Sequence, residues 1–134
     1  MKYLIIEDEA LAAERLLEKI TELRPLWQCL KVLSSLKELE QELKNTTAEL
    51  AFVDIHLGDG SSFVALEKWK VSFPLIFTTA YDQYAIKAFK LNSIDYLLKP
   101  IHNDDLKMAI EKLEHQKKNT GSQNDWTKLL NSLK

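Results

Sequence analysis

The sequence predicts an α/β fold in which helices cover both faces of a doubly wound, five-stranded parallel sheet. Short apolar runs alternate five times with amphipathic stretches of helical spacing, which is the order that βαβ units produce. Most of the apolar runs are continuous, as is typical of strands buried on both faces. Right-handed crossovers then restrict the topology to a few arrangements.

The five apolar runs are expected to be the strands of this sheet. The runs over residues 3–7 and 50–54 are the clearest, because each is short, apolar and rich in bulky side chains. The second run is less regular, since Gln28 and Lys31 interrupt it. The expected strands are residues 3–7, 27–33, 50–54, 74–78 and 94–98.

A helix is expected after each strand, because apolar residues recur there every three to four positions. Ser34 and Ser35 can cap the second helix, and the polar residues 103–105 can cap the last. Two glycines indicate a loop over residues 57–61. The expected helices cover residues 9–23, 36–44, 61–71, 82–91 and a long stretch that begins near residue 103.

Size and composition restrict the possible functions. A chain of 134 residues is expected to form one domain with a short appendage. The formal net charge of −2 gives no electrostatic argument for nucleic-acid binding by this chain. No apolar stretch approaches the roughly 20 residues that span a bilayer, so no membrane contact is expected. Cys29 is the single cysteine and is expected to be a small buried hydrophobe, which fits a cytoplasmic location.

Chemically active side chains stand where four of the expected strands end. They are Glu7 and Asp8 after the first strand, Asp54 at the end of the third, Thr79 after the fourth and Lys99 after the fifth. The carboxyl ends of parallel strands share one crevice, so we expect these side chains to meet there. Three carboxylates, a hydroxyl and an ammonium group suit a magnesium-dependent aspartate that accepts a phosphoryl group.

Each of these residues also has a plainer alternative role. Asp8 could cap the first helix, and Asp54 could cap a loop. Thr79 could be an ordinary hydroxyl at the end of a strand. In the functional interpretation, Asp54 attacks phosphorus to form an aspartyl phosphate, while Lys99 and Thr79 each bind one phosphoryl oxygen.

Four segments resemble the receiver domain of bacterial two-component response regulators. The matching segments are Glu7-Asp8, Asp54-Ile55-His56-Leu57, Thr79-Ala80-Tyr81 and Asp95-Tyr96-Leu97-Leu98-Lys99-Pro100. The resemblance covers residues 1 to about 115. It implies a flavodoxin-like, CheY-like fold with strand order 2-1-3-4-5. It also implies a signalling domain, not an enzyme, which assists only its own phosphorylation and dephosphorylation.

The resemblance implies a role for each site residue. Asp54 is the phosphoacceptor, and Thr79 and Tyr96 are the switch residues. Lys99 is the lysine of the family pattern, and its bond to Pro100 is typically cis. The expected ligands of Mg²⁺, the implied cofactor, are Glu7, Asp8, Asp54 and the backbone carbonyl of His56.

Residues 77–85 and 94–100 resemble, more specifically, receivers attached to LytTR-type DNA-binding domains. The resemblance implies a sensor histidine kinase as partner and a role in transcription regulation. The receiver is expected to span residues 1–118. Residues 119–134 are expected to begin the connection to an effector beyond Lys134, through which alone DNA would be bound.

A homodimer is expected through the face formed by the fourth helix, the fifth strand and the fifth helix. This expected dimer face includes Tyr84, Lys87, Phe89, Lys90, Asp95 and Lys112. An ordinary solvated surface is the alternative interpretation of the same residues.

The loop beside the site departs from the family pattern. Gly58 stands where many receivers have proline, and Ser62 stands where many have glycine, so a looser loop is expected. The His56 side chain could touch the phosphoryl group or the attacking water, or the residue could contribute only its carbonyl. Tyr81 could shield the phosphate from hydrolysis or lie aside.

Two other functions fit less well. A hydrolase of the aspartyl-phosphate type would need a second carboxylate two positions after the nucleophile, where this chain has His56. A degenerate or stand-alone receiver that acts as a protein-interaction module is the alternative. The joint presence of Asp54, Glu7, Asp8, Thr79 and Lys99 argues against a degenerate site.

Overall fold

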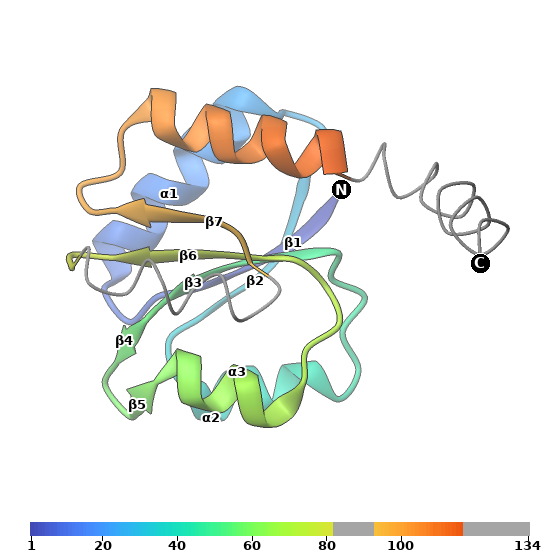
Figure 1. The fold of residues 1–134 in the computed structure, drawn as a ribbon, viewed down its shortest axis with the longest axis vertical. Helices are drawn as coiled ribbons and strands as arrows, with labels where there is room; N and C mark the ends of the chain where they lie inside the picture. Colours follow the sequence, from blue (N-terminus) through green and yellow to red (C-terminus); the bar gives the residue numbers. More distant parts are fainter. Residues whose placement is uncertain (82–92, 117–134) are drawn as a thin grey trace, which may run out of the picture.

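The computed structural model describes residues 1–81 and 93–116. These residues form a five-stranded parallel sheet between two layers of helices (Figure 1). The strand order is β2-β1-β3-β6-β7, which is the expected order 2-1-3-4-5 once the two short strands β4 and β5 are set aside. The strands of this sheet are β1 (Lys2–Ile6), β2 (Gln28–Leu33), β3 (Leu50–Asp54), β6 (Leu75–Thr79) and β7 (Ser93–Leu98).

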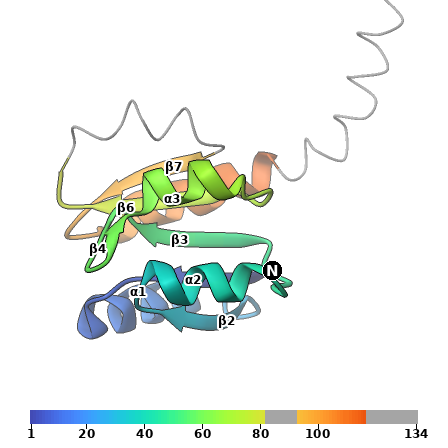
Figure 2. The same cartoon turned by 90° about the horizontal axis from the view of Figure 1, so that it is seen from below.

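Successive residues of each central strand face opposite helix layers. Tyr3 and Ile5 of β1 pack with α1 and the final helix, whereas Leu4 and Ile6 pack with α2 and α3. Figures 1 and 2 show the sheet between these two layers. The described helices are α1 (Ala10–Leu23), α2 (Leu36–Leu43), α3 (Ser62–Trp69) and a helix over residues 103–116, called the final helix below. The predicted α/β class is confirmed.

The parallel register aligns the strand ends that matter for function. Ile6 of β1 pairs with Val53 of β3, and Asp54 pairs with Thr78 of β6. Thr79 in turn pairs with Leu98 of β7. The residues at or just after the ends of these four strands therefore lie at one edge of the sheet.

Residues 57–61 differ from the predicted loop. They belong to an antiparallel hairpin of β4 (His56–Leu57) and β5 (Gly60–Ser61), joined by Gly58 and Asp59. The loop prediction was wrong here because two residues per strand are too few to produce a recognisable pattern.

The other predicted helices are found close to their expected positions. The expected cap of α2 is confirmed, since Ser35 Oγ accepts a hydrogen bond from Glu38 N at 3.1 Å. The helix expected over residues 82–91 and the connection expected over 119–134 lie outside the described residues. In the part of the chain that the structure describes, no helix has the length and apolar character needed to cross a bilayer.

Candidate functional site

Three carboxylates meet at the carboxyl edge of the sheet. Glu7 and Asp8 follow β1, and Asp54 ends the neighbouring strand β3. One oxygen from each carboxylate lies within 4.8 Å of the other two. The predicted convergence of this acidic cluster (Glu7, Asp8 and Asp54) is confirmed. No hydrogen bond shows Asp8 capping α1, whose N-cap residue is Glu9 and has no side-chain cap.

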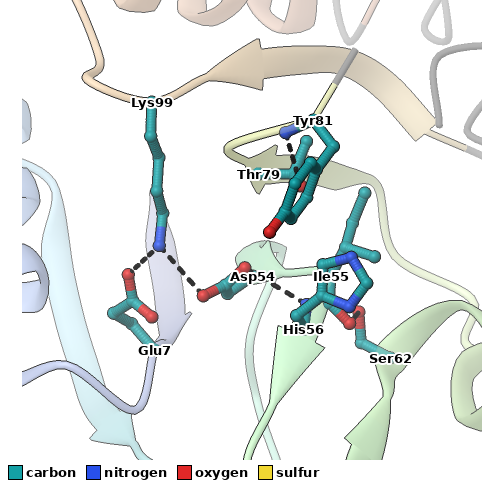
Figure 3. A network of polar contacts seen from close by, with 8 residues as sticks. All are labelled: Glu7, Asp54, Ile55, His56, Ser62, Thr79, Tyr81 and Lys99. Carbon is teal, nitrogen blue, oxygen red and sulfur yellow. Dashed lines mark hydrogen bonds and ion pairs between the residues drawn. The ribbon is translucent and has the colours of Figure 1, made fainter. Parts of the chain in front are cut away.

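Lys99 brings a positive charge to the acidic cluster. Its Nζ lies 2.9 Å from Asp54 Oδ2 and also contacts Glu7 Oε1 (Figure 3). The peptide bond between Lys99 and Pro100 is cis, as the sequence resemblance implied. Lys99 and Asp54 are 45 residues apart in the chain, so the parallel sheet is what brings them together.

Burial shapes the electrostatics of the site. Glu7 and Asp54 are 5% and 6% exposed, whereas Asp8 is exposed to solvent. Burial, followed by the nearness of Asp54, raises the pKa of Glu7 to about 7. Burial alone would lower the pKa of Lys99, but its hydrogen bonds to Glu7 and Asp54 outweigh burial and raise this pKa.

One oxygen of Glu7 is poised for a further ligand. Glu7 Oε1 contacts Lys99, whereas Oε2 is buried and has no hydrogen-bond partner among the described residues. A buried polar atom without a partner is costly, so a donor or a cation at Oε2 would stabilise the site. With Asp8 and Asp54, the Glu7 carboxylate offers an all-oxygen donor set, which fits a hard divalent cation such as Mg²⁺.

The backbone after Asp54 is fixed by hydrogen bonds on both sides. Ile55 N donates to Thr78 O at 3.0 Å, and Ile55 O accepts from Ser62 N at 2.9 Å. His56 N donates to Asp54 Oδ1 at 3.2 Å. Asp54 therefore does cap its own loop, as the plainer alternative proposed. Since its other oxygen meets Lys99, the loop-capping role and a chemical role are compatible.

Tyr81 links the two expected switch residues, Thr79 and Tyr96. Thr79 is 1% exposed, and its Oγ1 accepts a hydrogen bond from Tyr81 N at 3.2 Å (Figure 3). The hydroxyl of Tyr96 donates to the carbonyl of Tyr81. The Tyr81 ring meets the His56 ring edge to face, with the ring centroids 5.4 Å apart. No sequence pattern indicates the main-chain role of Tyr81, because every residue except proline has the same N–H and C=O groups.

The loop beside the site is held more firmly than the sequence suggested. Ser62 is fully buried, and its Oγ donates to Ile55 O at 3.3 Å. Asp59 accepts hydrogen bonds from Leu36 N at 2.9 Å and Lys37 N at 3.2 Å, at the start of α2. These contacts argue against the looser loop that Gly58 and Ser62 led us to expect. No role for Asp59 was predicted from the sequence.

Comparison with known proteins agrees with this geometry. Sensory transduction protein LytT of Enterococcus faecalis is 40% identical over 115 residues, which are 84% of this chain and 47% of the relative. Sensory transduction protein LytR of Staphylococcus haemolyticus is 35% identical over 123 residues, covering 90% of this chain and 48% of the relative. The chain thus spans about half the length of these curated relatives.

A solved structure supports the fold. The response regulatory domain of protein mrkE from Klebsiella pneumoniae superposes with a TM-score of 0.78 at 24% sequence identity, over 87% of this chain and 97% of that domain. Residues 3–111 match the family described as response regulator receiver domain. With its five-stranded parallel sheet and its acidic cluster in contact with a lysine, this chain belongs to the response regulator receiver domain family.

Proposed function

We propose that this chain accepts a phosphoryl group on Asp54 from a sensor histidine kinase and passes the signal on by a conformational change. The observation that carries the proposal is the contact of Asp54 with Lys99 inside the acidic cluster. In the transfer, a carboxylate oxygen of Asp54 attacks the phosphorus of a phosphohistidine. The P–O bond forms as the P–N bond breaks, and the imidazole nitrogen takes the electron pair and then a proton from water.

Mg²⁺ is the proposed cofactor of this step. Glu7, Asp8, Asp54 and the backbone carbonyl of His56 are the residues that would hold it. When bound, Mg²⁺ offsets the negative charge that gathers as the phosphoryl group approaches the carboxylates. The buried oxygen Glu7 Oε2, which has no partner among the described residues, supports this assignment.

Lys99 and Thr79 are proposed to bind the phosphoryl group once it is on Asp54. Lys99 Nζ already contacts Asp54 Oδ2, so it can move to a phosphoryl oxygen with little displacement. Thr79 Oγ1 accepts from Tyr81 N, which leaves its own proton available for donation to a second phosphoryl oxygen.

The conformational change is proposed to pass through Tyr81. Movement of Thr79 towards the phosphoryl group would disturb its hydrogen bond with Tyr81 N, and Tyr81 also carries the carbonyl that accepts from Tyr96. Tyr96 would then leave this carbonyl and turn inward. A ligand that favours one of two existing arrangements in this way shifts their populations.

A pocket beside the acidic cluster offers a partner protein a place to dock. A cavity of about 380 Å³ lies between α1 and residues 99–101, and Leu16, Phe52 and Ile101 are among its apolar lining residues. Arg15 and Lys19 also line it. We propose that the kinase, in the cytoplasm, approaches Asp54 from this side.

The output of the signal is proposed to lie beyond this chain. The curated relatives are about twice as long as the segment they share with it. We propose that residues 1–118 are the receiver and that 119–134 lead to a LytTR-type domain that binds DNA and controls transcription. Of the expected dimer face, Asp95 and Lys112 lie among the described residues, whereas Tyr84, Lys87, Phe89 and Lys90 do not.

The experiment compares phosphoryl uptake by intact-protein mass spectrometry after treatment with acetyl phosphate. The wild-type chain, Asp54→Asn and Asp104→Asn are each treated with Mg²⁺ and with a chelator. Asp104 is an exposed aspartate of the final helix, so its variant controls for the loss of one charge. The wild type and Asp104→Asn are expected to gain the phosphoryl mass with Mg²⁺, and Asp54→Asn is not.

Equal uptake by Asp54→Asn and the wild type would reject Asp54 as the acceptor. Uptake that is the same with Mg²⁺ and with chelator would reject the metal assignment. A wild-type chain that neither gains phosphate nor binds Mg²⁺ would favour the alternative, a degenerate receiver that acts as a protein-interaction module.

A further inference from the structure

The β4–β5 hairpin connects the acidic cluster to the start of α2. His56, whose carbonyl is a proposed metal ligand, is the first residue of β4. At the turn of the same hairpin, Asp59 accepts hydrogen bonds from Leu36 N and Lys37 N. These bonds span 23 and 22 residues of the chain, so Asp59 ties together two elements that are far apart in sequence.

The start of α2 depends on Asp59 for two of its hydrogen bonds. The first amides of a helix have no partner within the helix. Ser35 Oγ satisfies Glu38 N at 3.1 Å, whereas Asp59 satisfies the amides of the two residues before Glu38. The hydrogen bond from Leu36 N lowers the pKa of Asp59, and the positive end of the helix dipole favours the same negative charge.

The β4–β5 hairpin also lies close in space to both α2 and the acidic cluster. Gly60 has φ +142°, which other residues rarely adopt, and a Cβ there would lie 3.2 Å from Leu36 Cδ1. A Cβ at Gly58 would lie 3.8 Å from Asp8 Oδ2. The turn is therefore in contact range of α2 on one side and of the acidic cluster on the other.

We propose that Asp59 is a positioning residue for the metal site. By fixing the turn on α2, Asp59 holds the His56 carbonyl and the neighbourhood of Asp8 in the arrangement that binds a divalent cation. His56 and Asp59 belong to one short hairpin, so a displaced turn moves the His56 carbonyl with it. Residues that orient metal ligands contribute strongly to metal affinity although they never touch the metal. This inference rests on the proposed function.

The test is calorimetric titration of Mg²⁺ into the 134-residue chain. Asp59→Ala is expected to weaken Mg²⁺ binding by about tenfold and to keep the wild-type phosphorylation rate when Mg²⁺ is saturating. Ser35→Ala is the matched control, because it removes the other cap of α2 and leaves the hairpin contacts in place. It is expected to keep the wild-type Mg²⁺ affinity although it destabilises the same helix.

A second comparison distinguishes the effect of the position of the turn from the effect of the charge on Asp59. Asp59→Asn loses the same charge as Asp59→Ala but keeps an oxygen acceptor, so it is expected to retain more affinity. Gly60→Ala keeps both capping side chains, but its Cβ would lie 3.2 Å from Leu36 Cδ1 on a backbone with φ +142°. It is expected to displace the turn and weaken Mg²⁺ binding, and it serves if Asp59→Ala does not fold.

Three outcomes would overturn the proposal. One is equal Mg²⁺ affinity in Asp59→Ala and Ser35→Ala, and another is an equal loss in Asp59→Ala and Asp59→Asn, which would indicate charge alone. Wild-type affinity in Gly60→Ala is the third. Absence of Mg²⁺ binding by the wild-type chain would overturn the proposed function itself, and this inference with it.

Discussion

At Asp54, two electrostatic effects oppose each other. Glu7 and Asp8 repel an incoming phosphoryl group, while Lys99 Nζ, 2.9 Å from Asp54 Oδ2, attracts it. One ammonium group cannot balance the charges of the acidic cluster and a phosphoryl group, so the proposed transfer would need a second cation. The proposed role of Asp54 as acceptor therefore depends on the charges around it.

Replacing Lys99 by methionine tests this balance. Lys99→Met removes the charge that meets the phosphoryl oxygens, and we expect phosphorylation by acetyl phosphate to slow by about a hundredfold. The measurement is the initial rate of mass gain at saturating Mg²⁺. Lys107→Met is the control, because Lys107 is an exposed lysine of the final helix whose Nζ is 3.9 Å from Glu111. Equal rates in the two variants would contradict the role of Lys99.

Glu7 should make the stability of the metal-free chain depend on pH. Its pKa rises from an ordinary 4.5 to about 7 on folding. Between these values the unfolded chain releases the Glu7 proton while the folded chain keeps it. The free energy of unfolding should therefore fall as pH rises from 4.5 to 7 and level off above 7.

Glu7→Gln cannot ionise and should lose this part of the pH dependence. The stability difference between the wild type and Glu7→Gln is expected to change by about 3 kcal/mol across the window, to the disadvantage of the wild type at pH 7. Urea denaturation in a chelating buffer at several pH values measures it. Parallel pH profiles for the two chains would show that Glu7 ionises normally.

Among the structural elements, the segments between the strands contribute contacts to the site that the strands alone do not provide. The ends of β1 and β3 bring the carboxylates together, and the segment after β7 brings Lys99. Tyr81, in the segment after β6, links Thr79 at the end of β6 to Tyr96 of β7. Asp59, in the turn between β4 and β5, ties the hairpin to the start of α2. Loops on a rigid sheet commonly hold functional residues in this way.

The aromatic contact between Tyr81 and His56 predicts an effect of the Tyr81 ring on the lifetime of the phosphoryl group. Tyr81→Ala removes the ring but keeps the main-chain N–H and C=O that link Thr79 and Tyr96. Loss of an edge-to-face pair worth about 0.5–1.5 kcal/mol should speed loss of the phosphoryl group by about 2- to 10-fold. The decay is followed by mass after the phosphodonor is removed.

Tyr81→Phe distinguishes the effect of the ring from the effect of its hydroxyl. This variant keeps the ring and should keep the wild-type lifetime. If the phosphoryl group decays at the wild-type rate in Tyr81→Ala, the ring lies aside and His56 contributes only its carbonyl.

The strands and the acidic cluster were predictable from the sequence for a simple physical reason. Continuous apolar runs mark buried strands, and parallel strands end at one edge, so Glu7, Asp54 and Lys99 had to converge. The hairpin was missed because its strands are too short to show a period. The cap by Asp59 was missed because it joins residues 22 and 23 positions apart, and no local pattern encodes such a contact.

For the whole molecule, the sheet separates the two helix layers (Figure 1). The parallel register of its strands gathers the site at one edge. The chain covers about half the length of its curated relatives, and the proposed signal to an effector domain would need a surface on this chain that responds to Asp54. The expected dimer face is the proposed surface, and Asp95 Oδ1 already accepts from the backbone of the switch residue, Tyr96 N, at 2.8 Å.

Phosphorylation should change the association state of the chain. We expect the phosphorylated wild type to sediment as a dimer at concentrations where the unphosphorylated chain is a monomer. Lys112→Glu, at an exposed position of the final helix, should weaken the dimer without altering phosphoryl uptake. Sedimentation velocity measures both. A phosphorylated chain that stays monomeric over the same range would contradict the dimer face.

The most direct measurement locates the phosphoryl group itself. Borohydride reduces an aspartyl phosphate to homoserine, which peptide mapping by mass spectrometry identifies by position. After treatment with acetyl phosphate, we expect homoserine at position 54 alone, formed with Mg²⁺ and absent with chelator. Homoserine at another aspartate, or at position 54 to the same extent without a divalent cation, would contradict it.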